Sequence, residues 1–309
     1  MGGISPGHRR VSDDNPLNLF DDIKFWSRRG QRAPHKPLLL LYALGRCARG
    51  EPREVEYRTV DEKLAALLRD FGPSRKSVHT EYPFWRLQND GIWLLSKTDL
   101  VTRQGHTDAK KSELLKYNVR GGFPENIYTI FQRNPARIVD VARRLLESNF
   151  PETLHDEIAA SVGLDLSRLN LSHEKGTPPR DPEFRKRVLS TYEYRCAVCG
   201  FAVCIETTPV CLDAAHIRWH SQGGPDEERN GLALCVLHHK LFDLGAFTLK
   251  ESLIVEVSQN AYGHSGFDQN LLHYHGSTLR PPVNPTHRPD EEFLGWHRKE
   301  VFKHPPRPL

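Results

Sequence analysis

The 309-residue sequence has few cysteines, only six, and no apolar segment at its start that could act as a secretion signal. Its longest obvious apolar run, Leu38 to Leu44, is far shorter than the ~20 residues needed to span a bilayer. Cys47, Cys204 and Cys211 have no obvious partners, which argues against a disulfide framework. We therefore expect a protein of the reducing cytoplasm without a membrane segment.

The sequence also lacks a strong charge of either sign, because its formal net charge is +4 at pH 7. The charge is uneven: residues 1–175 hold 28 Lys and Arg against 23 Asp and Glu, whereas residues 176–309 hold 15 against 16. This balance favours the amino-terminal half as the part that holds nucleic acid. Many proteins that bind no nucleic acid reach the same balance, so the charge alone does not decide.

Two closely spaced pairs of metal-binding side chains stand out in the carboxy-terminal half. Cys196 and Cys199 form a CysxxCys pair, and Cys235 and His238 form a CysxxHis pair. Four soft or borderline ligands in two such pairs suit tetrahedral Zn²⁺, with one pair on each knuckle. The spacing predicts a structural zinc site, and four unrelated residues are the alternative.

A second set of polar residues lies between these pairs. Residues 210–218 are expected to form a strand, on which neighbouring side chains point to opposite faces. Asp213 then shares a face with Ala215 and opposes His216. Asn230 opens the next turn, before a short apolar strand.

The segment from Cys235 to Phe242 is expected to form a helix. Adjacent residues on a helix are rotated by about 100°. His238 can therefore face the zinc ion while His239 faces a catalytic cleft. Asp243, one turn after His239, is placed as a hydrogen-bond acceptor for it, although a solvent-facing Asp is an equal interpretation.

These residues resemble those of a known nuclease family. The string Asp213-Ala-Ala-His-Ile, then Asn230-Gly-Leu-Ala-Leu-Cys, then His238-His-Lys-Leu-Phe-Asp is similar to the HNH, or ββα-metal, nucleases. Within them it resembles the McrA-like, modification-dependent (type IV) restriction endonucleases. Many members carry Asp directly before the first His, where this chain has Ala215, so Asp213 would replace it as the metal ligand.

The resemblance implies one-metal hydrolysis of a phosphodiester bond in double-stranded DNA. His216 would be the general base, and Asn230 would orient His216 or the ββα turn. Asp213 and His239 would hold Mg²⁺ or Mn²⁺, which stabilises the negative charge that accumulates on the phosphate oxygens. A zinc module that binds DNA without cutting it is the alternative.

The sequence divides into two domains of an α+β protein. Residues 1–162 are expected to form a mainly helical DNA-reading domain, 163–182 a Pro-rich linker, and 183–309 a zinc-stapled ββα-metal nuclease domain. Apolar periodicity and caps predict helices in the first domain near 16–28, 37–49, 59–71, 108–117, 125–132, 135–149 and 152–162. Further predictions are a hairpin over 85–95 that turns at residues 89–91, a helix over 182–194, a hairpin over 246–258 and a helix over 291–303.

Cations lie ahead of an apolar helix in the first domain. Arg32, His35 and Lys36 precede Pro37, where positive charge opposes the helix macrodipole unless an anion docks there. A DNA phosphate is the natural anion. Solvated surface charge is an equal alternative, because such dipole effects are only about 0.3–1 kcal/mol.

An aromatic stretch in the first domain offers a reader for a DNA modification. Tyr82 and Pro83, expected at a strand entrance, could form the wall of a surface pocket beside Arg86. With the His35-Lys36-Pro37 segment, they resemble the sulfur-binding domain that precedes the HNH domain in phosphorothioate-dependent restriction endonucleases. A polar loop after this stretch holds further candidates to read base edges, namely Arg103, Gln104 and His106.

Two properties stay open at this point. The first domain could instead recognise 5-methylcytosine. The nuclease would then be the same, and the recognised DNA modification would be a methyl group in place of sulfur. Because each chain has one HNH site, cutting both strands would favour a homodimer on the DNA.

Overall fold

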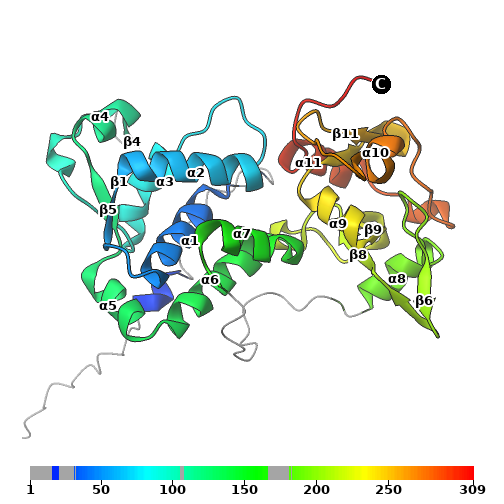
Figure 1. Cartoon of the computed structure of the whole chain (residues 1–309), viewed down its shortest axis with the longest axis horizontal. Coiled ribbons are helices and arrows are strands. Elements are labelled where there is room, and N and C mark those ends of the chain that lie inside the picture. The colour runs from blue at the N-terminus through cyan, green and yellow to red at the C-terminus, as the bar shows by residue number, and fades with distance from the viewer. Residues whose placement is uncertain (1–15, 21–30, 32, 105–107, 166–180, 182) are drawn as a thin grey trace, which may run out of the picture.

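The structure, a computed structural model, describes residues 16–20, 31, 33–104, 108–165, 181 and 183–309. Figure 1 shows two parts side by side, with the amino-terminal residues, blue to green, on the left and the carboxy-terminal residues on the right. The architecture is α+β, as predicted. Most of the predicted linker, 163–182, lies outside the described residues.

The amino-terminal half is mainly helical. Its helices are α1 (His35–Ala48), α2 (Tyr57–Phe71), α3 (Glu81–Arg86), α4 (Lys111–Lys116), α5 (Glu125–Arg133), α6 (Ala136–Asn149) and α7 (His155–Val162). Short 3₁₀ turns include Pro16–Phe20, Leu87–Asp90, Thr98–Leu100 and Glu152–Leu154, the last labelled η4. The predicted helices near 37–49, 59–71, 125–132 and 135–149 are confirmed. The helix predicted near 108–117 is the shorter α4, and that predicted over 152–162 is η4 followed by α7. Of the helix predicted over 16–28, Pro16–Phe20 form a 3₁₀ turn, and residues 21–28 lie outside the described residues.

Helix α1 forms the centre of this half. Its residues from Leu38 to Leu41 are all fully buried, as expected for a helix that is apolar on every side. Helices α2, α3, α5, α6 and α7 pack around it. The apolar run that stood out in the sequence is therefore the axis of the amino-terminal core.

Short strands complete this half. They are β1 (Glu54–Glu56), β2 (Leu94–Leu95), β3 (Arg103–Gln104), β4 (Asp108–Ala109) and β5 (Arg120–Gly122). Strands β1, β5 and β2 form an antiparallel sheet in that order, and β3 pairs with β4.

The hairpin predicted over residues 85–95 is wrong. Trp85 lies in α3, a 3₁₀ turn follows it, and Gly91 ends that turn in the left-handed conformation at φ 74°. Leu94 and Leu95 pair with β5 instead. A glycine with positive φ suits a hairpin turn or the end of a helix equally well, and burial of Phe84, Trp85 and Leu87 favours the helical alternative here.

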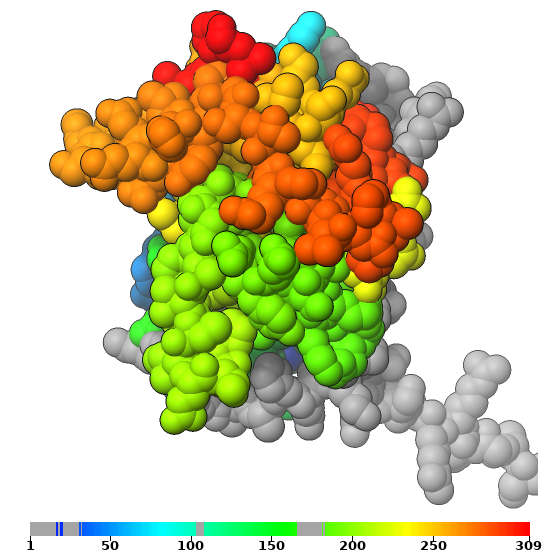
Figure 2. All heavy atoms as spheres, turned by 90° about the vertical axis from the view of Figure 1, so that its right-hand side faces the viewer, coloured from blue at the N-terminus to red at the C-terminus, as the bar shows by residue number. Residues whose placement is uncertain are grey.

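The carboxy-terminal half is built around a ββα unit. Its elements are α8 (Phe184–Thr191), β6 (Val203–Ile205), β7 (Thr208–Val210), β8 (Leu212–His216), β9 (Gly231–Cys235), α9 (Val236–Asp243), β10 (Phe247–Leu249), β11 (Val255–Val257), α10 (Phe267–Asn270) and α11 (Glu291–Glu300). Further 3₁₀ turns are His220–Gln222 (η5), Glu228–Asn230 (η6), Glu251–Leu253, Leu272–Tyr274 and Pro285–His287. The predicted strand, hairpin and helices of this half are confirmed, with bounds that differ by a few residues. Figure 2 shows its outer face, where the orange segment around α10 projects to one side.

Strands β8 and β9 pair antiparallel, with His216 opposite Gly231. Both α8 and α9 pack against this pair. Gly231 faces α8, because a Cβ atom there would lie 2.4 Å from a methyl group of Val188. A side chain at this position would push α8 off the strands.

The two halves share a core. Trp219, Trp296 and Val301 of the carboxy-terminal half pack into the cluster of the amino-terminal half, and the two indole rings lie 5.8 Å apart. Arg75 also donates to the buried carboxylate of Glu300 at 2.7 Å. The amino-terminal half therefore contacts the carboxy-terminal half directly. Among the described residues, no helix has the length and apolar character to cross a membrane.

Candidate active site and metal centre

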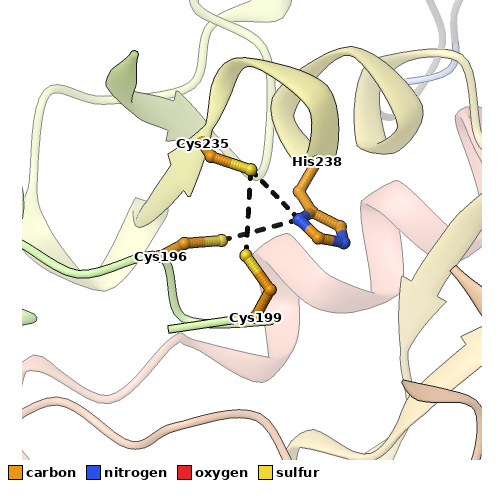
Figure 3. Close-up of side chains that lie close together, drawn as sticks. All are labelled: Cys196, Cys199, Cys235 and His238. Atoms are coloured by element: carbon orange, nitrogen blue, oxygen red, sulfur yellow. Dashed lines mark hydrogen bonds between the residues drawn. The ribbon is translucent and has the colours of Figure 1, made fainter. Parts of the chain in front are cut away.

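The four predicted zinc ligands come together as expected (Figure 3). Their donor atoms all lie within 4.8 Å of one another. Cys235 Sγ is 3.1 Å from Nδ1 of His238 and 3.9 Å from Sγ of Cys199, and Cys196 Sγ is 3.7 Å from the same Nδ1. Cys235 ends β9 and His238 lies in the first turn of α9, so the ββα unit itself positions one pair.

A hydrogen bond of His238 supports metal binding by this group. Its Nε2 donates to the carbonyl oxygen of Asn270 at 2.8 Å. This bond places the proton on Nε2 and leaves the Nδ1 lone pair directed at the three sulfur atoms. The donor set and the tautomer both fit Zn²⁺, so the cluster can hold a structural zinc ion in the carboxy-terminal half.

His239 lies between two carboxylates. Its Nδ1 is 3.5 Å from Oδ2 of Asp213, and its Nε2 is 3.3 Å from Oδ2 of Asp243. Burial by itself lowers the pKa of His239, but these carboxylates outweigh it and raise the pKa to about 9. The contact with His239 lowers the pKa of Asp213. The structure thus joins Asp213 and His239, the two residues predicted to hold the catalytic metal.

Nδ1 of His239 is the atom that most suggests a missing cation. It is buried, and it has no hydrogen-bond partner among the described residues. Nε2 faces Asp243, which accepts its proton, so Nδ1 is the nitrogen that can bind a metal, on loss of its own proton, together with the carboxylate of Asp213. One imidazole and one carboxylate are suitable ligands for Mn²⁺ or Mg²⁺.

Asp243 is the acceptor that the sequence suggested, and it is fully buried. Its Oδ1 accepts from Nε1 of Trp219 at 2.9 Å, and its Oδ2 accepts from His239 and from the hydroxyl of Thr153. Burial opposes ionisation, but His239 prevails and lowers the pKa of Asp243. Asp243 is therefore a carboxylate that orients His239, and the alternative of a solvent-facing Asp is excluded.

Asn230 holds the loop between β8 and β9. It is fully buried, its Oδ1 accepts from the backbone N–H of Arg218 at 2.8 Å, and its Nδ2 donates to the carbonyls of Arg218 at 3.0 Å and Pro225 at 2.9 Å. Only glycine fits at position 224 of this loop, because a Cβ atom there would lie 1.8 Å from the carbonyl oxygen of Arg218. The sequence left two roles for Asn230, to orient His216 or to orient the ββα turn. Its hydrogen bonds go to backbone groups of the turn, which fits the second role.

His216 has a partner that the sequence did not reveal. Its Nε2 lies 2.7 Å from Oδ1 of Asp226, and its ring stacks on Phe184 of α8 at 4.2 Å. Oδ2 of Asp226 accepts from the backbone N–H of Asp181 at 2.7 Å. Burial raises the pKa of Asp226, but these contacts outweigh it and lower the pKa overall. Asp226 thus remains an anion beside the predicted general base.

Asp213 and His216 contact different helices that pack on the β8–β9 pair. Asp213 faces α9 through His239, whereas His216 faces α8 through Phe184. This agrees with the alternation expected for a strand over these residues. The ring centroid of His220 lies 5.8 Å from that of His216.

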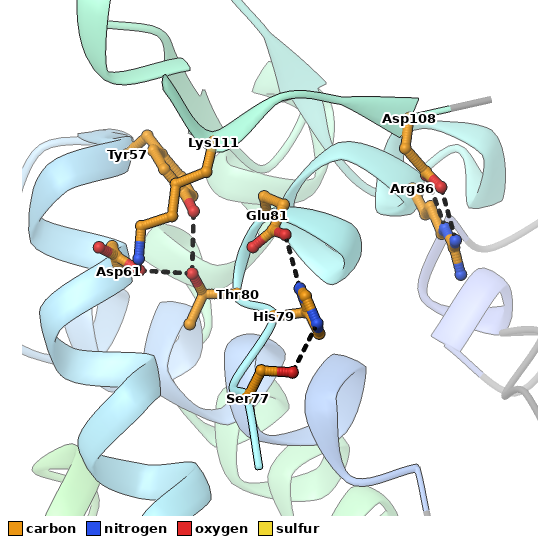
Figure 4. A network of polar contacts seen from close by, with 9 residues as sticks. All are labelled: Tyr57, Asp61, Ser77, His79, Thr80, Glu81, Arg86, Asp108 and Lys111. Carbon is orange, nitrogen blue, oxygen red and sulfur yellow. Dashed lines mark hydrogen bonds and ion pairs between the residues drawn. The ribbon is translucent and has the colours of Figure 1, made fainter. Parts of the chain in front are cut away.

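Two cations of the candidate reader are paired with acids among the described residues. Arg86 donates to both oxygens of Asp108, at 2.8 and 2.7 Å (Figure 4), and Lys36 forms an ion pair with Asp90. His35 differs from the expectation of a cation: burial, aided by Arg75, lowers its pKa to about 4. It is therefore neutral at pH 7.

The candidate sulfur pocket differs from the prediction. Tyr82 and Pro83 lie in the short helix α3 and not at a strand entrance, because proline is tolerated in the first turn of a helix. Pro83 is buried, whereas Tyr82 is half-buried. The Tyr82 ring stacks on His79 at 4.7 Å and lies 4.8 Å from the guanidinium of Arg86. Of these two residues, Tyr82 is therefore the one whose side chain is partly exposed to a ligand.

Four other predicted reader residues have no side-chain description. Arg32 and His106 lie outside the described residues, and Arg103 and Gln104 are described only as the backbone of β3.

Comparison with protein families gives two matches. Residues 14–167 match the ScoMcrA-like DNA sulfur-binding domain, and residues 196–250 match the HNH endonuclease family. A search of curated proteins found no match. By these matches the chain is a DNA endonuclease of the HNH type. More particularly, it joins that nuclease domain to an amino-terminal ScoMcrA-like DNA sulfur-binding domain.

Several solved structures are similar to the amino-terminal half. The sulfur-binding domain of ScoMcrA complexed with phosphorothioated DNA is 22% identical, with a TM-score of 0.43, and the match covers 49% of this chain and 96% of that one. The sulfur-binding domain of SprMcrA, also complexed with phosphorothioated DNA, is 25% identical, with a TM-score of 0.40 and coverage of 48% and 91%. The type IV phosphorothioation-dependent restriction endonuclease ScoMcrA is 22% identical, with a TM-score of 0.41 and coverage of 48% and 32%. The match therefore spans about a third of that enzyme.

Proposed function

We propose that this chain is a type IV restriction endonuclease that binds phosphorothioated DNA and hydrolyses a phosphodiester bond nearby with Mg²⁺ or Mn²⁺. The observation that carries the proposal is the match of one chain to both a DNA sulfur-binding domain and an HNH nuclease domain. The proposed boundaries are 1–162 for the reader, 163–182 for the linker and 183–309 for the nuclease.

In the proposed mechanism, His216 is the general base. It takes a proton from the attacking water, which contributes on the order of 10²–10⁴-fold to the rate. The carboxylate of Asp226, 2.7 Å away, stabilises the imidazolium that forms. Asn230 keeps the loop that carries Asp226 in place through its bond to Pro225.

The proposed metal ligands are Asp213 and His239. When bound there, the divalent ion supplies positive charge for the phosphate and leaving oxygens. Asp243 orients His239 by accepting from its Nε2. Cys196, Cys199, Cys235 and His238 are the proposed Zn²⁺ ligands, and they fix the start of the same helix.

The proposed reader distinguishes sulfur from oxygen by hydration. A non-bridging sulfur is larger, more polarizable and less strongly hydrated than the oxygen it replaces. Contact with the ring of Tyr82 then costs little for sulfur, whereas burying an unpaired oxygen costs about 1–3 kcal/mol. Arg86 and Lys36 would hold the neighbouring backbone, and Arg103, Gln104 and His106 would read base edges.

The test is cleavage of three duplexes of one sequence: unmodified, cytosine-methylated and phosphorothioated. We expect cutting of the phosphorothioated duplex alone, in the presence of Mg²⁺ or Mn²⁺, and a loss of cutting in His216→Ala. Cutting of the methylated duplex would overturn the reader and keep the nuclease. If no duplex is cut, the chain is a DNA-binding protein without catalysis. Double-strand cuts would favour a homodimer on DNA, because each chain holds one site.

A further inference from the structure

The carboxylate that orients His239 is also held by the other half of the chain. Thr153 lies in η4 of the amino-terminal half, between α6 and α7, and its hydroxyl donates to Oδ2 of Asp243. The same oxygen faces Nε2 of His239. Two polar contacts, both to the carboxylate of Asp243, therefore link the amino-terminal half to the candidate metal ligand.

The position of Thr153 is fixed from both sides. Lys240, the residue after His239, donates to the carbonyl oxygen of Thr153 and pairs with Glu157 of α7. Gln222 of η5 reaches the carbonyl of Asn149 at the end of α6, at 3.4 Å. Figure 1 shows α7 at the boundary between the halves, next to α9. The contact is thus part of an extended junction.

The hydrogen bonds at Asp243 determine what Thr153 does. A carboxylate only accepts, so Trp219, Thr153 and His239 all donate to it. Asp243 is buried, so solvent has little access to replace a donor that is lost. With Thr153 and Trp219 holding the carboxylate, Nε2 of His239 donates to it, and Nδ1 lies beside Asp213 as the nitrogen left for a metal.

We propose that Thr153 is a positioning residue of the nuclease site: through Asp243 it holds His239 in the orientation that binds the divalent metal. This rests on the proposed function, because it assumes that Asp213 and His239 hold that metal. The nuclease site is then complete only when the amino-terminal half is docked on α9.

The experiment is a Mn²⁺ titration of the full-length, zinc-loaded protein, with free Mn²⁺ followed by electron paramagnetic resonance and no DNA present. Thr153→Val keeps the shape of the side chain and removes the hydroxyl, whereas Thr153→Ser keeps the hydroxyl. Loss of a partner of a metal ligand typically weakens metal binding 10–100-fold. Thr153 acts on His239 through Asp243, so we expect the dissociation constant for Mn²⁺ to rise at the lower end of this range, about 10-fold, in Thr153→Val. It should stay near the wild-type value in Thr153→Ser.

Asp213→Asn separates this inference from the proposal on which it rests. If Asp213→Asn loses Mn²⁺ and Thr153→Val binds it like wild type, the role of Thr153 is overturned and the metal site stands. If Asp213→Asn also binds Mn²⁺ like wild type, the metal site itself is wrong, and the role of Thr153 falls with it. Thr153→Ser that binds as weakly as Thr153→Val would show that packing, and not the hydroxyl, matters, which would also overturn the inference.

Discussion

Nε2 of His216 lies 2.7 Å from the carboxylate of Asp226, ten residues further along the chain, and both side chains are mostly shielded from solvent. The proposed general base, which would gain a proton during the reaction, therefore lies beside a carboxylate. This is the arrangement by which a carboxylate stabilises an imidazolium.

The first prediction concerns this pair. Asp226→Asn replaces a charged hydrogen-bond acceptor with a neutral one and keeps the shape of the side chain. Hydrogen bonds to charged groups exceed neutral ones by about 1 kcal/mol or more, so the single-turnover cleavage rate should fall roughly 10-fold. His216→Ala should lose more, in the range of about 10²–10⁴-fold. An Asp226→Asn variant that cuts at the wild-type rate would remove Asp226 from the mechanism.

The second prediction concerns zinc. Cys235→Ser removes one of the four clustered ligands, whereas Cys204→Ser changes an exposed cysteine outside the cluster. We expect Cys235→Ser to lose the zinc and to unfold the carboxy-terminal half, because metal binding at such sites is coupled to folding. Elemental analysis and thermal unfolding measure both effects. Retention of full thermal stability by a zinc-free variant would contradict the assignment, and Cys204→Ser should match wild type.

The third prediction is a pH dependence of stability. His35 has a folded pKa of about 4, below its ordinary value of 6.5, because burial, Arg75 and His79 lower it and outweigh the opposing effect of Glu81. The unfolded chain therefore binds a proton that the folded chain does not bind between pH 6.5 and pH 4. The contribution of His35 to the free energy of unfolding is full above pH 6.5 and is lost as the pH falls, by about 3 kcal/mol at pH 4.

His35→Gln checks this contribution, since glutamine stays neutral at every pH. Urea unfolding of the amino-terminal half at several pH values should show a flatter acid dependence in this variant than in wild type. His264→Gln changes an exposed histidine and serves as the matched control. Equal slopes for wild type and His35→Gln would contradict the prediction.

The fourth prediction separates recognition of the sulfur from binding of the DNA backbone. Tyr82→Ala should reduce the preference for phosphorothioated over unmodified DNA, because the ring is the proposed contact of the sulfur. Arg86→Ala should weaken binding to both DNAs. It should also weaken the salt dependence, so that the negative slope of log binding constant against log salt concentration becomes shallower by about 1. Binding measured at several salt concentrations distinguishes these effects. An unchanged preference in Tyr82→Ala would exclude that residue from the sulfur contact.

Local patterns predicted most of the fold. The apolar run from Leu38 to Leu41, the periodic helices around it and the ββα unit follow from sequence spacing alone. Ligand spacing also predicted the zinc cluster, and the resemblance to the HNH nucleases implied that Asp213 and His239 meet. The helices and the two members of each zinc-ligand pair are close in sequence, where periodicity and spacing decide which side chains meet.

The errors and omissions come from tertiary contacts. The turn at Gly91 could end a helix or join two strands, and only the buried packing of Phe84 and Trp85 decides between them. Asp226 and Thr153 carry no local pattern, since their partners are set by how a loop folds back and how the halves dock. The neutral state of His35 likewise results from burial that sequence does not display.

Sulfur-directed cleavage is the central claim, and a competition between two duplexes tests it most directly. Both have the same sequence, differ by one phosphorothioate, carry different fluorescent labels and are mixed in equal amounts with the protein and Mn²⁺. The account predicts that the phosphorothioated duplex is cut roughly 10-fold faster or more, as expected from the cost of burying an oxygen in its place. Equal initial rates for the two duplexes would contradict it.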